Sequence, residues 1–122
     1  YKTCQFVSLH IPATAETKQS INYSLLSLMP KGALLINTAR KEVIYEEDLA
    51  RILEDRTDFH YVADVAPTIA DTLKEKFGNR IFFTPKKMGA QTSEANINAG
   101  IAAARQSVGY LKDSIDKFRV NK

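Results

Sequence analysis

Three stretches of this sequence place polar side chains directly after short apolar runs. They are the stretch 37–40, which ends in Arg40, the strand-ending Asp64, and the turn 84–92 with its lysine pair Lys86-Lys87. The guanidinium of Arg40 is a planar fork that can bind a carboxylate through two parallel hydrogen bonds. A nearby lysine of lowered pKa could accept a proton. Together these residue types suit chemistry on a small carboxylic acid.

Each of these residues also has a purely structural interpretation. Arg40 could be a surface arginine, Asp64 the cap of a turn, and Lys86-Lys87 a solvated pair. His10, which lies inside an apolar run, could be a structural histidine rather than a base. A functional interpretation therefore depends on whether the fold brings the three stretches to one place.

The elements around these residues predict such a convergence. Short continuous apolar runs closed by turn residues are typical of strands buried on both faces of a parallel sheet. Four runs fit this pattern, at 6–11, 33–38, 59–64 and 80–84, and helical patterns at 23–29, 46–53 and 71–77 alternate with them. The predicted fold is α/β, the C-terminal half of a Rossmann-like parallel sheet with crossover helices, followed by a long C-terminal helix. Ligands of such sheets bind beyond the carboxyl ends of the strands.

The last segment predicts a helix of roughly 25 residues that begins at Thr92 or Ser93. A narrow apolar seam runs along it, made of Ile97, Ile101, Ala104, Val108, Leu111, Ile115 and Phe118. A helix of this length exceeds what the small sheet can cover, so we expect it to extend onto another domain or a second subunit. The predicted division is 1–91 for the C-terminal part of a dinucleotide-binding domain and 92–122 for this helix.

Composition narrows the class of partner. The 122 residues carry a net charge of +3, which favours anionic small molecules through long-range steering. The basic residues are dispersed and not interleaved with aromatics, so nucleic acid is not an expected partner. No apolar stretch approaches the roughly 20 residues of a membrane span. The single cysteine, Cys4, allows no internal disulfide, so we expect a cytoplasmic protein, and we predict no metal site.

Four segments, in order and spacing, resemble the NAD-dependent D-2-hydroxyacid dehydrogenases. They are Phe6-Val-Ser-Leu-His-Ile-Pro12, Leu35-Ile-Asn-Thr-Ala-Arg40, Val62-Ala-Asp-Val65, and Thr84-Pro85 followed by Met88-Gly-Ala90. The resemblance covers nearly the whole chain, and its sharpest part is Asn-Thr-Ala-Arg. The turn 85–92 and the helix after it look closest to one subgroup, whose substrate is a phosphorylated 2-hydroxy acid.

The resemblance implies a role for each matching residue. Arg40 would bind the carboxylate and carbonyl oxygen of a small anionic 2-hydroxy acid. NAD would be the cofactor, with Asp64 bonded to the nicotinamide carboxamide. The implied cofactor-binding residues are His10, Pro12, Thr38, Ala39, Asp64 and Gly89. The long helix would return to the substrate-binding domain, and a homodimer is a family expectation.

Two departures from the family pattern concern the acid/base. The family's usual histidine is replaced in the turn by Lys86-Lys87, of which we favour Lys87, and Ile69 stands where a supporting glutamate is usual. A carboxylate would hold a lysine in its charged form, whereas an apolar neighbour and a second cation lower its pKa. Both departures therefore fit a lysine base.

The glycines at 32, 78, 89, 100 and 109 form no Gly-x-Gly-x-x-Gly motif. We therefore expect the pyrophosphate site to lie upstream of this sequence, and this chain alone to bind NAD poorly. Three alternatives remain open at this point. They are a family member that acts on an unphosphorylated substrate, a nucleotide-sensing protein without turnover, and a dimerisation fragment.

Overall fold

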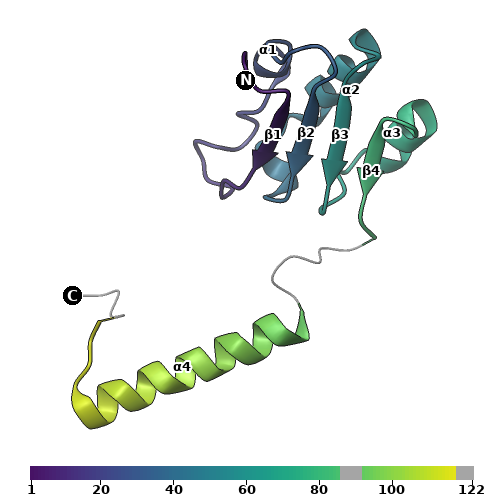
Figure 1. The fold of residues 1–122 in the computed structure, drawn as a ribbon. Coiled ribbons are helices and arrows are strands. Elements are labelled where there is room, and N and C mark those ends of the chain that lie inside the picture. Colours follow the sequence, from purple (N-terminus) through teal and green to yellow (C-terminus); the bar gives the residue numbers. More distant parts are fainter. Residues whose placement is uncertain (86–91, 118–122) are drawn as a thin grey trace. The chain divides into compact units, whose positions relative to one another are not determined.

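A computed structural model describes residues 1–85 and 92–117 of the chain (Figure 1). The chain divides into two compact units, Tyr1–Lys87 and Met88–Lys122. The first unit contains the sheet and its crossover helices, and the second contains one long helix. Within the described part of the chain, no helix is long and apolar enough to cross a membrane.

Four parallel strands form the sheet in the order of the chain. They are β1 (Phe6–Leu9), β2 (Leu34–Asn37), β3 (His60–Ala63) and β4 (Ile81–Phe83). All four arrows in Figure 1 point the same way, so their carboxyl ends meet at one edge. The register aligns Leu9, Asn37, Ala63 and Phe83 in one row at that edge. The strands lie within the predicted runs and are a little shorter.

Short helices connect the strands, as the alternating pattern predicted. They are α1 (Tyr23–Leu26), the 3-10 turn η1 (Lys41–Val43), α2 (Glu46–Asp55) and α3 (Ala70–Phe77). Successive right-handed crossovers in one direction bring their helices to the same face of a sheet. The buried residues of α1, α2 and α3 share one core with the inward side chains of the strands. The chain therefore has the predicted α/β, Rossmann-like parallel sheet.

The other face of the sheet corrects one expectation. We expected the strand at 33–38 to be buried on both faces, but only Leu35 and Asn37, on the helix side, are fully buried. On the opposite side Leu34 and Ile36 are half-buried, and the flanking Phe82 is 60% exposed. The reason is the common direction of the crossovers, which leaves this face without a helix from the first unit.

The first helix is shorter than the predicted 23–29. Asn22 caps it, because its side-chain oxygen accepts the backbone N–H of Leu25. The N–H groups of Leu28 and Met29 then bind carbonyls three residues back, so the last turns tighten beyond Leu26.

The long helix α4 spans Ser93–Asp113, 21 residues, with none of its residues buried. Thr92 caps it by accepting the N–H of Ala95. It ends earlier than predicted because Ser114 adopts a left-handed conformation (φ 53°), and the N–H of Ile115 then returns to the carbonyl of Gly109. The predicted seam therefore does not continue helically to Ile115. Its last member, Phe118, lies outside the described residues.

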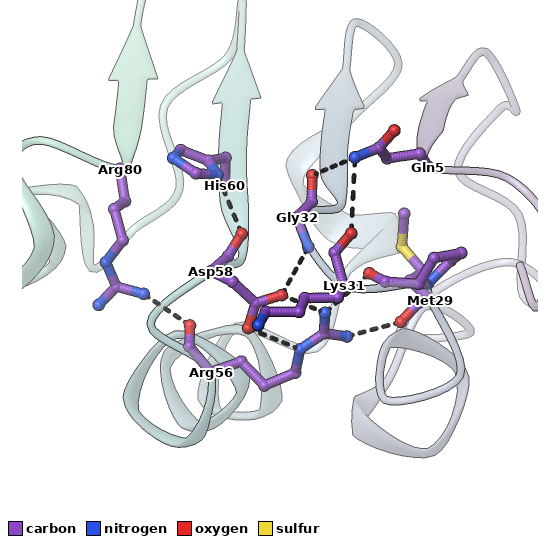
Figure 2. Close-up of polar contacts among 9 residues, drawn as sticks. Gln5, Met29, Lys31, Gly32, Arg56, Asp58, His60 and Arg80 are labelled. Atoms are coloured by element: carbon purple, nitrogen blue, oxygen red, sulfur yellow. Dashed lines mark hydrogen bonds and ion pairs between the residues drawn. The ribbon is translucent and has the colours of Figure 1, made fainter.

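A compact polar network closes the amino edge of the sheet (Figure 2). Arg56 donates to the carbonyls of Met29 and Pro30 at 2.7 and 2.8 Å and forms an ion pair with Asp58 at 2.6 Å. Asp58 also accepts the backbone N–H of Gly32 at 2.6 Å. Gly32 has a positive φ of 73°, which glycine adopts without strain. The network thereby fixes the turn that leads into β2.

Candidate functional site

The carboxyl edge of the sheet carries a hollow of about 470 Å³. It lies where the segments after β1 and β2 meet. Its lining residues are His10, Ile11, Pro12, Ala13, Thr38, Ala39 and Arg40. Five of the predicted site residues are thus brought to one place, namely His10, Pro12, Thr38, Ala39 and Arg40. Of the three stretches expected to converge, only the one that ends in Arg40 lines this hollow, and the rest of the lining comes from the segment after β1.

Asn37 organises the backbone that presents Arg40. It is the one buried polar residue in the core of the described structure, with no exposed surface. Its oxygen accepts the N–H of Ala39 at 3.0 Å, and its amide nitrogen donates to the carbonyl of Arg40 at 3.0 Å. An amide held on both sides fixes the turn after β2. Arg40 is therefore positioned by a buried side chain three residues before it.

Tyr61, on the neighbouring strand β3, contacts the side chain of Asn37. The amide nitrogen of Asn37 donates to the Tyr61 hydroxyl at 3.4 Å. Burial raises the pKa of Tyr61 to about 12, and its ring meets that of Phe83 edge to face at 5.8 Å between centroids. The phenol therefore stays neutral in any ordinary buffer. The hydrogen bond between Asn37 and Tyr61, which supports the Arg40 turn, therefore does not change with pH near neutrality.

Arg40 itself extends from this turn with an exposed side chain. One of its terminal nitrogens donates to the carbonyl of Ala39 at 2.8 Å. No carboxylate within residues 1–85 and 92–117 forms an ion pair with it. The guanidinium has five N–H donors in a fixed fork. It therefore retains donors that can bind an anionic ligand at the hollow.

Asp64 follows β3 at the same edge and has an unusual environment. Its backbone N–H donates to the carbonyl of Asn37, and its carbonyl accepts the hydroxyl of Thr84 at 3.1 Å. Its side-chain Oδ1 is buried, and within the described part of the chain nothing donates a hydrogen bond to it. A buried acceptor without a donor is costly, and such atoms are rare in folded proteins. This atom fits a donor on a bound ligand, such as a carboxamide N–H.

His10 joins two hydroxyl groups at the rim of the hollow. Its Nε2 lies 2.8 Å from Ser8 Oγ, and its Nδ1 lies 3.1 Å from Thr38 Oγ1. Thr38 also donates to the carbonyl of Leu9 at 3.3 Å. The chain of contacts links the end of β1 to the segment after β2. The polar contacts of His10 agree with a structural role, and its exposed position at the hollow agrees with a functional one.

A second hollow, of about 560 Å³, lies beside η1 and the start of α2. Its lining contains charges of both signs, namely Lys18 and Lys41 together with Glu42, Glu46 and Glu47. Lys41 donates to the Thr68 hydroxyl, and the carboxylate of Glu46 accepts the N–H groups of Thr68 and Ile69. These groups hold the loop between β3 and α3 in place. Ile69 itself packs against the core.

Three predicted site residues, Lys86, Lys87 and Gly89, lie outside the described residues. Conversely, the structure adds Asn37 and Ser8, which sequence reasoning did not select as site residues. Asn37 had a signal, since an amide at the end of an apolar run must find buried partners. Ser8 also had a signal, since residues i and i+2 of a strand share one face and His10 lies two residues after it.

Comparison with known proteins agrees with this geometry. The family described as "D-isomer specific 2-hydroxyacid dehydrogenase, NAD binding domain" matches residues 1–85. A D-3-phosphoglycerate dehydrogenase of Haemophilus influenzae is 32% identical over 125 residues, which cover 98% of this chain and 30% of the relative. The chloroplastic D-3-phosphoglycerate dehydrogenase 2 of Arabidopsis thaliana is 37% identical over 122 residues, covering 98% of this chain and 19% of the relative.

A solved structure gives the same result. The NAD⁺-bound 3-phosphoglycerate dehydrogenase of Entamoeba histolytica is 49% identical, with a TM-score of 0.84, and the match covers 99% of this chain and 40% of that one. The chain thus spans between a fifth and two fifths of the length of these relatives. By its matched sequence and its sheet, the chain belongs to the NAD-binding domain family of the D-isomer specific 2-hydroxyacid dehydrogenases.

Proposed function

We propose that the protein carrying this chain oxidises D-3-phosphoglycerate to 3-phosphohydroxypyruvate with NAD, a step of serine biosynthesis. The observation that carries the proposal is Arg40 at the carboxyl edge, held by Asn37 and paired with no carboxylate of the described chain. The names and identities of the relatives support the choice of substrate.

The residues at this edge suit the nicotinamide end of NAD, which accepts hydride when bound. The orphaned Oδ1 of Asp64 matches a carboxamide donor. Thr38 and Ala39 would lie along the nicotinamide ribose, and His10 and Pro12 would line the cleft. Gly89, which follows β4 in the sequence, would allow close approach of the cofactor. The rest of the dinucleotide needs residues that this sequence does not contain.

In the proposed reaction, Arg40 binds the substrate carboxylate and the oxygen on C2. This fixes the C2–H bond toward the nicotinamide and stabilises the carbonyl as it forms. The C2 hydroxyl proton passes to the Nζ of neutral Lys87 while hydride leaves C2, and the C–O bond becomes a carbonyl. Lys86 is the alternative base. Its cation also helps to keep Lys87 neutral.

The division of the chain belongs to the same proposal. Residues 1–91 would complete a dinucleotide-binding domain begun elsewhere in the protein, and residues 92–122 would return to a substrate-binding domain. The exposed apolar residues of α4, such as Ile97 and Leu111, support an external partner for this helix. We further propose a cytoplasmic homodimer, a family expectation that the apolar seam of α4 supports for the dimer and the single cysteine supports for the compartment.

The test is NADH formation by the complete protein with D-3-phosphoglycerate between pH 6 and 10. Arg40→Ala should lower kcat/KM about 100-fold through lost charge-assisted hydrogen bonds. Lys87→Ala should lower kcat and abolish the acidic limb of the pH profile, where protonation of the base slows the wild type, with Lys86→Ala as its neighbour control. Arg51→Ala, on the exposed face of α2, should leave kcat/KM unchanged.

Other outcomes would redirect the proposal. Activity that survives Lys87→Ala but not Lys86→Ala would move the base by one residue. A preference for hydroxypyruvate over its 3-phosphate in the reverse direction would indicate a hydroxypyruvate or glyoxylate reductase of the same family. Dinucleotide binding without turnover of any 2-hydroxy acid would indicate a nucleotide-sensing protein, an alternative favoured by the absence of the usual histidine.

A further inference from the structure

The contacts of His10 contain information about its protonation. Thr38 Oγ1 lies 3.3 Å from the carbonyl oxygen of Leu9 and 3.1 Å from His10 Nδ1. A threonine hydroxyl has one hydrogen to donate, and a carbonyl oxygen can only accept. If that hydrogen goes to Leu9, then Nδ1 of His10 must be the donor to Thr38. Otherwise two lone pairs would face each other across 3.1 Å.

The other ring nitrogen then has a defined role. A neutral imidazole carries one N–H, so with Nδ1 protonated its Nε2 is an acceptor. Ser8 Oγ lies 2.8 Å from Nε2 and can donate to it. Ser8 then donates to His10, His10 donates to Thr38, and Thr38 donates to the carbonyl of Leu9, so each of the three contacts has one donor and one acceptor. The reverse arrangement leaves the carbonyl of Leu9 facing a hydroxyl oxygen without a hydrogen.

We propose that Ser8, His10 and Thr38 form a directed hydrogen-bond chain that holds His10 as its Nδ1–H tautomer, so that Thr38 faces the cleft only as an acceptor. His10 is in this view a positioning residue that acts through Thr38. The group of the ligand that meets Thr38 must then be a donor, such as a sugar hydroxyl. The inference rests on the proposed function only in this last step, because the tautomer is a property of the chain itself.

The experiment reads the tautomer directly. The complete protein, labelled with ¹⁵N-histidine, is examined by two-bond ¹H–¹⁵N correlation near pH 8.5, where imidazole is normally neutral. The His10 signals are those lost in His10→Gln. His60, whose Nδ1 lies 3.1 Å from the carbonyl of Asp58, is an internal reference, because that carbonyl also requires an Nδ1–H (Figure 2). We expect His10 to show the same pattern as His60.

Two variants of Thr38 test the origin of the tautomer. Thr38→Val keeps the shape of the side chain and removes the hydroxyl, so His10 should shift toward the Nε2–H form. Thr38→Ser keeps the hydroxyl and should preserve the wild-type pattern. An Nε2–H form in the wild type, or a pattern unchanged by Thr38→Val, would overturn the inference.

A binding measurement separates the inference from the proposed function. By calorimetry, NAD should bind about tenfold more weakly to Thr38→Val, the loss of roughly one hydrogen bond, and within about twofold to Thr38→Ser. Equal affinity in Thr38→Val would overturn the acceptor role of Thr38. A wild type that shows the Nδ1–H form but binds no dinucleotide would contradict the proposed function while leaving the tautomer established.

Discussion

The two edges of the same sheet use the same residue types in opposite ways. At the amino edge, Arg56 and Asp58 bind each other at 2.6 Å, and their remaining bonds go to backbone groups (Figure 2). At the carboxyl edge, Arg40 donates to the carbonyl of Ala39 and pairs with no described carboxylate, and Asp64 keeps a buried oxygen to which no described residue donates. One edge pairs its charges with each other, and at the other edge no described residue pairs with them, which fits the proposed ligand site.

The difference teaches how a small sheet separates stability from binding. Arg80 extends the amino-edge network by donating to the carbonyl of Arg56 at 2.8 Å, so this edge locks the turns that enter the strands. At the carboxyl edge, Asn37 is the only fully buried polar side chain of the described core. It bonds to the backbone of Ala39 and Arg40 and makes no bond to the guanidinium of Arg40. A charge that the fold itself neutralises cannot also bind a substrate.

The largest expected effect comes from breaking the amino edge. Arg56→Ala removes donors to two backbone carbonyls and leaves Asp58 without its cation, so the free energy of unfolding should fall by on the order of 2 kcal/mol. Urea titration of the complete protein measures it. Arg51→Ala, whose ion pair with Asp55 is well exposed, is the matched control and should change stability by less than about 0.5 kcal/mol. Equal losses in the two variants would contradict the proposed role of the network.

A smaller and opposite effect is expected at Asp64. Asp64→Ala removes a buried oxygen that lacks a donor, so the unfolding free energy should stay the same or rise. NAD affinity should fall about tenfold, because the proposed bond to the carboxamide is lost. Asp58→Ala is the crossed control, which should lose stability and keep NAD affinity. A marked loss of stability in Asp64→Ala would mean that its carboxylate serves the fold.

The smallest effect concerns acid. The hydrogen bond from the Arg56 side chain, followed by that from the Gly32 N–H, holds the pKa of Asp58 well below its usual value of 3.8. Since the folded-state pKa is the lower one, the stabilisation is complete above about pH 5. It is lost as the pH falls below 4 toward the folded-state value. Over that window the unfolding free energy of Asp58→Asn should decline less steeply than that of the wild type, by under about 1 kcal/mol. Parallel curves would remove Asp58 from the acid response.

Much of the fold could be predicted, because its signals are local. Apolar runs ending in turn residues predicted the four strands, and of the two candidate starts of the long helix, Thr92 and Ser93, the structure makes Thr92 the cap. The errors also have local causes. The 23–29 helix was predicted too long because tight turns and helical turns share the same apolar spacing. The long helix was predicted too long because it ends at a left-handed Ser114, and serine is not the residue that usually marks such an end.

The candidate site was predictable only in part. Arg40 was selected from its residue type and its place after an apolar run, Thr38 and His10 from a family resemblance, and the hollow brings the three together. The contacts of Asn37 with Tyr61 and of His10 with Thr38 required the structure, because they join segments 24 and 28 residues apart that only the strand register brings together. The roles of Lys86 and Lys87 stay predictions.

The sequence by itself determined the class of fold and the residue types available for chemistry. Both follow from periodicity and side-chain identity, which act over a few neighbouring residues. Only the tertiary structure decided which arginine is held by the fold and which has no carboxylate partner among the described residues. Arg56 and Arg40 are the same residue type, but the fold places Arg56 against the backbone carbonyls of Met29 and Pro30 at the amino edge, whereas Arg40 extends from the turn that Asn37 holds at the carboxyl edge. Met29 and Pro30 lie 27 and 26 residues away from Arg56 along the chain, so no local pattern records these contacts.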